Sequence, residues 1–258
     1  MPDLLTRRDG DVLVLTINRP ERMNAATLAL ADEMSAALDD LDGARTVLIT
    51  GSGRAFCAGA DLAARATIID SRGQASEASL REHYNPLILR LTALDVPVVA
   101  AVNGAAAGIG CSLALAADLV LAGRSAYFLQ AFVNIGLVPD GGSSWMLPRL
   151  IGTARAKAMM MLGERVSAGQ AEEWGLIHRC VDDDELMGEA TALAHRLAAG
   201  PTLALGQIRQ LVAHSAHSGL PDALTAEASA QGLAADSADA TEGGAAFLAK
   251  RPARFTGR

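Results

Sequence analysis

Two glycine-rich stretches decide how this chain folds: AFCAGADL, from Ala55 to Leu62, and AVNGAAAGIG, from Ala101 to Gly110. Each follows an apolar run typical of a β-strand and leads into a segment that favours helix. The start of a helix leaves backbone N–H groups without partners, and the helix dipole favours negative charge there. Two such turns can offer two N–H groups to one oxygen, as in an oxyanion hole. The glycines also suit tight turns and close packing, so spacing alone leaves both interpretations open.

The rest of the first two hundred residues predicts an α/β fold. Period-two or continuous apolar runs predict strands at Val12–Ile17, Thr46–Thr50, Val96–Val102 and Leu119–Ala122. Apolar residues at helical spacing predict helices from about Thr27, from Leu80, over Cys111–Ala117 and over Gly152–Leu162. The order is strand, strand, helix, repeated with insertions.

Beyond Gly163 the pattern becomes mostly helical. Ser167 to Gln170 fits a capping box, Gly175 can end the helix that follows, and Asp183–Ala199 predicts a longer helix. Three Ala-rich helices are predicted after Pro201, at Leu203–Val212, Pro221–Ala235 and Thr241–Lys250. We therefore divide the chain into a core, residues 1–200, and a helical region, residues 201–258. The apolar faces of that region suggest an oligomer interface, although an intramolecular cap fits nearly as well.

Composition excludes several classes of protein. The chain has 258 residues, of which 50% are hydrophobic, and a formal charge of −7 without a Lys/Arg cluster, which disfavours nucleic-acid binding. No apolar run is long enough to span a membrane and the N-terminus lacks a signal-peptide core, so we expect a soluble cytoplasmic protein. Neither the five histidines nor the three cysteines have metal-ligand spacing, so no metal site is expected. The polar segment from Ala63 to Ser79 is the best candidate for a mobile loop.

Four motifs carry a resemblance to a known family: AFCAGADL, AVNGAAAGIGCSLALAADLVLAG, IGLVPDGG and SAGQAEEWGLI, in this order along the chain. On these motifs the chain is identified as a member of the crotonase superfamily, the enoyl-CoA hydratase/isomerase family. The resemblance implies a spiral of ββα units with a C-terminal helical trimerisation region, assembled as a trimer or a dimer of trimers. It implies acyl-CoA thioester substrates and no cofactor, because coenzyme A is part of the substrate.

The resemblance also assigns the site. The two oxyanion amides fall on Ala60 and on Ile109, which follows Gly108. These amides would stabilise the enolate that forms when a base removes a proton from the acyl chain. Further contacts to CoA or to the acyl chain would come from Arg22, Met23, Ala25, Ala58, Asp61, Leu62, Phe132, Pro139 and Lys250. Arg22 is equally well explained as a solvated loop charge, Lys250 as an exposed helix end, Asp61 as a helix cap and Phe132 as core.

The chain departs from the hydratase pattern at two positions. Well-known hydratases carry glutamates where this chain has Ser112 and Phe132, and neither of these side chains orients and activates water as a carboxylate does. The remaining carboxylate is Asp140, in the turn Pro139-Asp140-Gly141-Gly142. It can serve as a single acid/base, whereas the same four residues also form favourable turn chemistry.

Further stretches resemble one branch of the family, the ring-epoxide isomerases of phenylacetate degradation, which also shift double bonds in the enoyl-CoA esters of fatty-acid metabolism. They are Tyr84-Asn-Pro-Leu87, Gln130-Ala-Phe132, GLVPD and the tail AFLAKRPARFTG. We therefore predict an enoyl-CoA double-bond or ring-epoxide isomerase with Asp140 as its base. The alternatives are an enoyl-CoA hydratase and a catalytically silent acyl-CoA-binding homologue.

Overall fold

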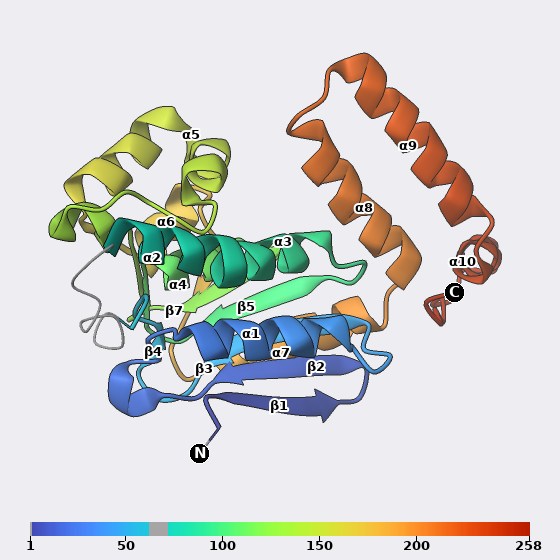
Figure 1. Ribbon diagram of the computed structural model, residues 1–258. Coiled ribbons are helices and arrows are strands. Elements are labelled where there is room, and N and C mark those ends of the chain that lie inside the picture. Colours follow the sequence, from blue (N-terminus) through green and yellow to red (C-terminus); the bar gives the residue numbers. More distant parts are fainter. Residues whose placement is uncertain (1, 62–71) are drawn as a thin grey trace.

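The larger of two mixed β-sheets forms the centre of the fold (Figure 1). The structure, a computed structural model, describes residues 2–61 and 72–258. Its larger sheet has the order β1-β2-β3-β5-β7-β10, and only the β1–β2 pair is antiparallel. The strands are β1 Leu4–Asp9, β2 Val12–Ile17, β3 Thr46–Gly51, β5 Val98–Val102, β7 Leu119–Gly123 and β10 Arg179–Val181.

The smaller sheet contains short strands that the sequence pattern did not reveal. It has the order β4-β6-β8-β9, in which only the β8–β9 pair is antiparallel. Its strands are β4 Ala55–Cys57, β6 Ala105–Ala107, β8 Tyr127–Leu129 and β9 Arg165–Ser167. β4 and β6 lie inside the two glycine-rich stretches, so each stretch is a short strand as well as a turn.

Consecutive strands alternate between the two sheets, which creates the repeated ββα unit. β3, β5 and β7 belong to the larger sheet, whereas β4, β6 and β8 follow them directly in the smaller one. The helices of this part are α1 Leu28–Asp39, α2 Arg72–Ser79, α3 Asn85–Ala93, α4 Ile109–Leu115, α5 Ser143–Leu162, α6 Ala168–Glu173 and α7 Leu186–Ala198. The arrangement is the crotonase fold that the sequence predicted.

The core lies on both faces of the larger sheet. On one face Leu15, Ile49 and Val98 pack with α1, α3 and α4, and on the other Leu48 and Val99 pack under α7. All six residues of β3 are buried. A parallel strand covered on both faces is apolar throughout, which explains its continuous hydrophobic run.

Several helix boundaries differ from the sequence prediction, and three of them lie near the two glycine-rich stretches or the Asp140 turn. Residues Arg72–Ser79 form α2 and a π-helical turn at Leu80–Tyr84 joins it to α3, so the expected loop is wrong for this part; residues 62–71 lie outside the described residues. The Ser79 hydroxyl donates to the Ala75 carbonyl at 2.7 Å, which shows how a polar segment is accommodated within a helix. α4 begins at Ile109 and α5 at Ser143, with Gly152 at φ 76° forming a kink.

The C-terminal helices project from the core (Figure 1). They are α8 Thr202–Ser215, α9 Leu220–Ala235 and α10 Ala238–Leu248, and few of their residues are buried. The almost fully buried Arg209 guanidinium fastens α8 to the core, because it donates to Asp118 at 2.6 Å and to the Leu91 carbonyl at 2.9 Å. Across residues 2–61 and 72–258, no helix is both long and apolar enough to cross a membrane.

Candidate active site

The first predicted oxyanion donor, Ala60, lies in a segment paired with the loop before α1. The Ala26 N–H donates to the Gly59 carbonyl at 2.7 Å, and the Asp61 N–H donates to the Ala26 carbonyl at 2.8 Å. This is a parallel bridge between Ala26 and Ala60 in which Ala26 makes both bonds. The N–H of Ala60 therefore points away from Ala26. Within the described residues no backbone or side-chain acceptor takes it.

Asn24 holds the loop that carries Ala26. It is fully buried, has a left-handed φ of 56°, and donates to the carbonyls of Ser52 at 2.9 Å and Ala55 at 2.6 Å. Its own side-chain oxygen accepts from the Arg19 N–H at 2.8 Å. Asparagine tolerates this backbone conformation better than most residues, and its short amide satisfies three backbone groups at once.

Arg19 joins the same loop to Asp61. Its guanidinium lies 3.0 Å from the Asp61 carboxylate and 3.2 Å from that of Asp3, and it also donates to the Ala25 carbonyl. The side chains of Arg19 and Asp61 are only 14% and 13% exposed, so water screens this pair less than a surface ion pair. Sequence reasoning missed Arg19 and Asn24 as site builders, because their roles depend on segments distant in the chain.

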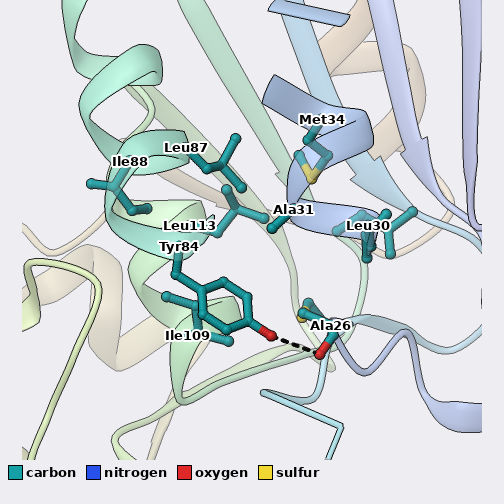
Figure 2. A pocket seen from close by; sticks show the side chains of 11 residues that line it. Ala26, Leu30, Ala31, Met34, Tyr84, Leu87, Ile88, Ile109 and Leu113 are labelled. Atoms are coloured by element: carbon teal, nitrogen blue, oxygen red, sulfur yellow. Dashed lines mark hydrogen bonds between the residues drawn. The ribbon is translucent and has the colours of Figure 1, made fainter. Parts of the chain in front are cut away.

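Tyr84 fixes the first donor from the other side. Its hydroxyl donates to the Ala26 carbonyl at 2.9 Å, the same oxygen that accepts the Asp61 N–H (Figure 2). The side chain is 3% exposed and comes from the π-helical turn before α3. Tyr84 marked a family branch in the sequence, but its contact with this segment was not predicted.

The second predicted donor, Ile109, is the first residue of α4. Gly108 precedes it with φ 53° and ψ −127°, a conformation that favours glycine. Because Ile109 is the first helical residue, its N–H has no acceptor within the helix. No other described group accepts this N–H. A Cβ on Gly108 would lie 3.7 Å from the Gly59 Cα, so the two turns are in contact. The two predicted donors, Ala60 and Ile109, thus lie in backbone segments that are next to each other.

Asp140 lies in the turn that packs on the start of α4. A Cβ on the next residue, Gly141, would come within 2.4 Å of the Ile109 Cδ1 and 2.8 Å of the Ser112 Cβ. The backbone carbonyl of Asp140 accepts the Ser112 hydroxyl at 2.9 Å and the Ser143 N–H at 3.1 Å. The turn that carries the predicted base is therefore held against the residue that carries the second predicted donor.

An apolar pocket lies between the two turns and the helices that cover them. Figure 2 shows side chains from α1, the π-helical turn, α3 and α4 around it. Its lining is Ile17, Ala26, Leu30, Ala31, Met34, Cys57, Tyr84, Leu87, Ile88, Ile109 and Leu113. Its free volume of about 10 Å³ is near the minimum for one water molecule, so the pocket has no room for a larger group in this conformation.

The buried thiols near the pocket are not nucleophiles. Burial raises the pKa of Cys57 to about 11 and that of Cys111 to about 12. Both groups are neutral thiols at neutral pH, and the thiolate is the reactive form.

The structure places most of the remaining predicted contacts around the first turn or the Asp140 turn. The Ala58 N–H donates to the Met23 carbonyl at 3.0 Å, which brings Met23, Ala25 and Ala58 together, with Arg22 exposed beside them. Phe132 is buried, and its ring lies 3.6 Å from where a Cβ on Gly108 would be. Pro139 is half-buried beside Asp140.

Two predicted contacts do not join this cluster. Lys250 is exposed and follows α10, which Figure 1 shows at the opposite side of the molecule from β4. Leu62 lies outside the described residues. Among the residues that the structure describes, no cluster of His, Cys, Asp and Glu is arranged to hold a metal ion.

Comparison with known proteins places this site in a family context. The enoyl-CoA hydratase/isomerase family profile matches residues 7–258. The chain is 45% identical to the 1,2-epoxyphenylacetyl-CoA isomerase of Escherichia coli, covering 100% of both chains. It is 46% identical to a probable enoyl-CoA hydratase of Rhodobacter capsulatus, over 95% of this chain and 94% of the relative. A solved enoyl-CoA hydratase from Bacillus anthracis is 30% identical, with a TM-score of 0.93 and 100% coverage of both chains.

Proposed function

Because this chain belongs to the enoyl-CoA hydratase/isomerase family, we propose that it moves double bonds in acyl-CoA thioesters with Asp140 as its acid/base. In this proposal the Asp140 carboxylate removes a proton from the carbon next to the thioester of a 3-enoyl-CoA. The electron pair moves onto the thioester oxygen, and the N–H groups of Ala60 and Ile109 stabilise the enolate. The protonated Asp140 then returns the proton to carbon 4, and the double bond ends between carbons 2 and 3.

The packing of the Asp140 turn on Ile109 supports this proposal most directly. The turn that carries the Asp140 carboxylate packs against Ile109, the residue that carries one of the two predicted donors. A single well-placed donor to an oxyanion contributes roughly 2.7–4 kcal/mol to lowering a barrier. One carboxylate within reach of carbons 2 and 4 of the acyl chain is sufficient for a proton shift that adds no water.

A hydratase is the second candidate, favoured by the relative from Rhodobacter capsulatus. Water addition needs a group that activates water beside the group that protonates carbon. The Ser112 hydroxyl is instead engaged with the Asp140 carbonyl and the Ser143 hydroxyl, and Phe132 has no polar side-chain atom. These contacts favour the isomerase over the hydratase. The silent acyl-CoA-binding homologue is the third candidate, and the experiment below also tests it.

For the substrate, the proposal extends to a ring-epoxide of a phenylacetyl-type CoA thioester. The similarity to the isomerase from Escherichia coli supports this class, which would place the enzyme in phenylacetate degradation. We propose that CoA lies along the first turn, against Arg22, Met23, Ala25, Ala58, Asp61 and Leu62. Gly108, Phe132 and Pro139 would then contact the acyl end.

We further propose that residues 1–200 act as the acyl-CoA core in the cytoplasm and that residues 201–258 assemble the chain as a homotrimer or a dimer of trimers. Exposed apolar side chains on α8, α9 and α10 support the assembly, among them Ile208, Val212, Leu224, Leu233 and Phe247. In such an assembly Lys250 would contact the CoA phosphates of a neighbouring subunit.

The test uses purified protein with 3-hexenoyl-CoA and, separately, 2-hexenoyl-CoA, with Asp140→Asn as the paired variant. An isomerase converts the 3-enoyl ester into the conjugated 2-enoyl ester without a change in mass, and Asp140→Asn loses this conversion. Hydration of the 2-enoyl ester as the dominant reaction would replace the proposal with the hydratase. A folded protein that binds both esters but turns over neither them nor a ring-epoxide thioester would leave the silent homologue.

A further inference from the structure

Three polar side chains are completely buried where α4 meets the Asp140 turn. Ser112, Gln130 and Ser143 each have 0% exposure. The proposed proton transfer uses none of the three. Burying a polar group is costly unless it is hydrogen-bonded, so this cluster calls for a physical reason.

The three side chains form one continuous hydrogen-bonded chain. The Gln130 amide nitrogen donates to the Ser143 hydroxyl at 3.0 Å, and the two serine hydroxyls are 2.6 Å apart. Ser112 donates to the Asp140 backbone carbonyl at 2.9 Å. Since a hydroxyl has one proton to donate, the bonds run in a single direction, from Gln130 through Ser143 and Ser112 to Asp140.

This chain of bonds connects three elements. Gln130 follows β8, Ser112 lies in α4 and Ser143 is the first residue of α5. The Ser112 hydroxyl also lies 3.4 Å from the carbonyl of Gly108, the residue before the second predicted donor. The Ser112 hydroxyl therefore contacts both the backbone at the start of α4 and the backbone of the predicted base, Asp140.

We propose that Ser112, Ser143 and Gln130 are positioning residues that fix the distance between Asp140 and the Ile109 amide. The inference rests on the proposed acid/base role of Asp140. The hydrogen-bond chain ends on the Asp140 backbone and not on its carboxylate, so it sets the position of the base without adding charge beside it. A displacement of about 1 Å between reacting groups can reduce a rate about a hundredfold.

The test compares Ser112→Ala, Ser143→Ala and their double variant in the 3-hexenoyl-CoA assay. Each single variant should lower kcat about 10-fold to 100-fold, with KM within about twofold of wild type and the midpoint of the pH profile unchanged. The double variant should be no slower than the slower single variant, because both break the same chain of bonds. Ser79→Ala is the matched control, since Ser79 is also buried and donates to a backbone carbonyl but lies outside this cluster.

Thermal unfolding of each variant separates loss of positioning from loss of fold. If Ser112→Ala does not fold, Ser143→Ala alone carries the test, because it removes the central link. A folded Ser112→Ala or Ser143→Ala enzyme with wild-type kcat would overturn the inference, as would multiplicative losses in the double variant. Asp140→Asn is measured in parallel: if it stays active, the proposed function itself fails, whatever the serine variants do.

Discussion

The two turns that hold the predicted oxyanion donors are neighbours in space, yet they are built differently. Ala60 has its place because Ala26 pairs on both sides of it, and Ala26 in turn depends on Asn24 and Tyr84. Ile109 has its place because it is the first residue of a buried helix. The first donor is thus positioned by tertiary contacts, and the second by local helix geometry.

The difference predicts which substitutions remove each donor from its position. A helix start exposes N–H groups wherever it forms, so the second donor is lost only when the helix is displaced. The first donor is lost when any of several distant side chains is removed, even if the fold survives. Substitutions in the second turn should therefore lower stability and activity together. Substitutions around the first turn can lower activity in a protein that still folds.

The largest effect is expected from Gly110→Val, which breaks the second turn. A Cβ at this position would lie 2.2 Å from the Cys57 carbonyl oxygen, so α4 must move away from β4. Overpacking typically costs about 1–3 kcal/mol, and here the loss should be larger because the clash is with the backbone of Cys57. The donor moves with the helix. We expect a lower Tm and loss of isomerase activity together. Gly188→Ala is the control, because it has no atom within 4 Å of an added Cβ and should not lower the Tm.

Asn24→Ala should break the first turn. The substitution removes three hydrogen bonds, which join Asn24 to the Ser52 and Ala55 carbonyls and to the Arg19 N–H. It also keeps a left-handed backbone on alanine. We expect a stability loss of about 2–4 kcal/mol in urea unfolding and a lower kcat in the folded fraction. Asn134→Ala, at an exposed residue that donates to one carbonyl, should change stability by less than about 0.5 kcal/mol. Equal losses in the two variants would refute the special role of Asn24.

Tyr84→Phe sharpens the comparison because it removes a single hydroxyl. The Ala26 carbonyl keeps the Asp61 N–H, so the loss in stability should be about 0.5–1.5 kcal/mol. We expect kcat to fall more than KM changes, since the first donor becomes less well fixed. The half-buried Tyr127 in β8 provides the matched Tyr→Phe control. An unchanged kcat in Tyr84→Phe would show that the hydroxyl does not position Ala60.

The smallest effect should come from Glu242, which lies in α10, far from either turn. Hydrogen bonds from Arg251 and from the Arg254 N–H lower the Glu242 pKa from 4.5 to about 2. A carboxylate whose pKa is lowered in the folded state stabilises above its unfolded pKa, and this contribution disappears as the pH falls from about 4.5 to about 2. The Tm difference between wild type and Glu242→Gln should therefore shrink over this range, with kcat at neutral pH unchanged. A difference independent of pH would contradict the assignment.

The sequence predicted the parts of the fold that local patterns control. The continuous apolar run of β3 and the Ser167 cap, whose hydroxyl accepts the Gln170 N–H at 3.3 Å, were both evident from residue spacing. The short strands β4 and β6 were not, because three residues carry no periodicity and their pairing is between distant segments. The helical Arg72–Ser79 segment was missed because its composition is polar.

The candidate site divides in the same way. Ala60, Ile109 and Asp140 were found through family motifs, and the structure brings their backbone segments together. The roles of Asn24 and Tyr84 could not be predicted, since each depends on one carbonyl contributed by another part of the chain. The sequence marked Ser112 only as a position where hydratases have a glutamate. Its hydroxyl contacts the backbone of both Asp140 and Gly108.

The most direct test of the central claim is deuterium exchange at the acyl α-carbon, followed by mass spectrometry in D₂O with 3-hexenoyl-CoA. The wild-type enzyme should form the 2-enoyl ester without addition of water. Solvent deuterium should enter the acyl chain in each turnover in which the proton on Asp140 exchanges with D₂O before Asp140 delivers it to carbon 4. The Asp140→Asn variant should bind the same ester but neither exchange nor isomerise it. Exchange by Asp140→Asn at the wild-type rate would show that another group removes the proton, and the account of this site would be wrong.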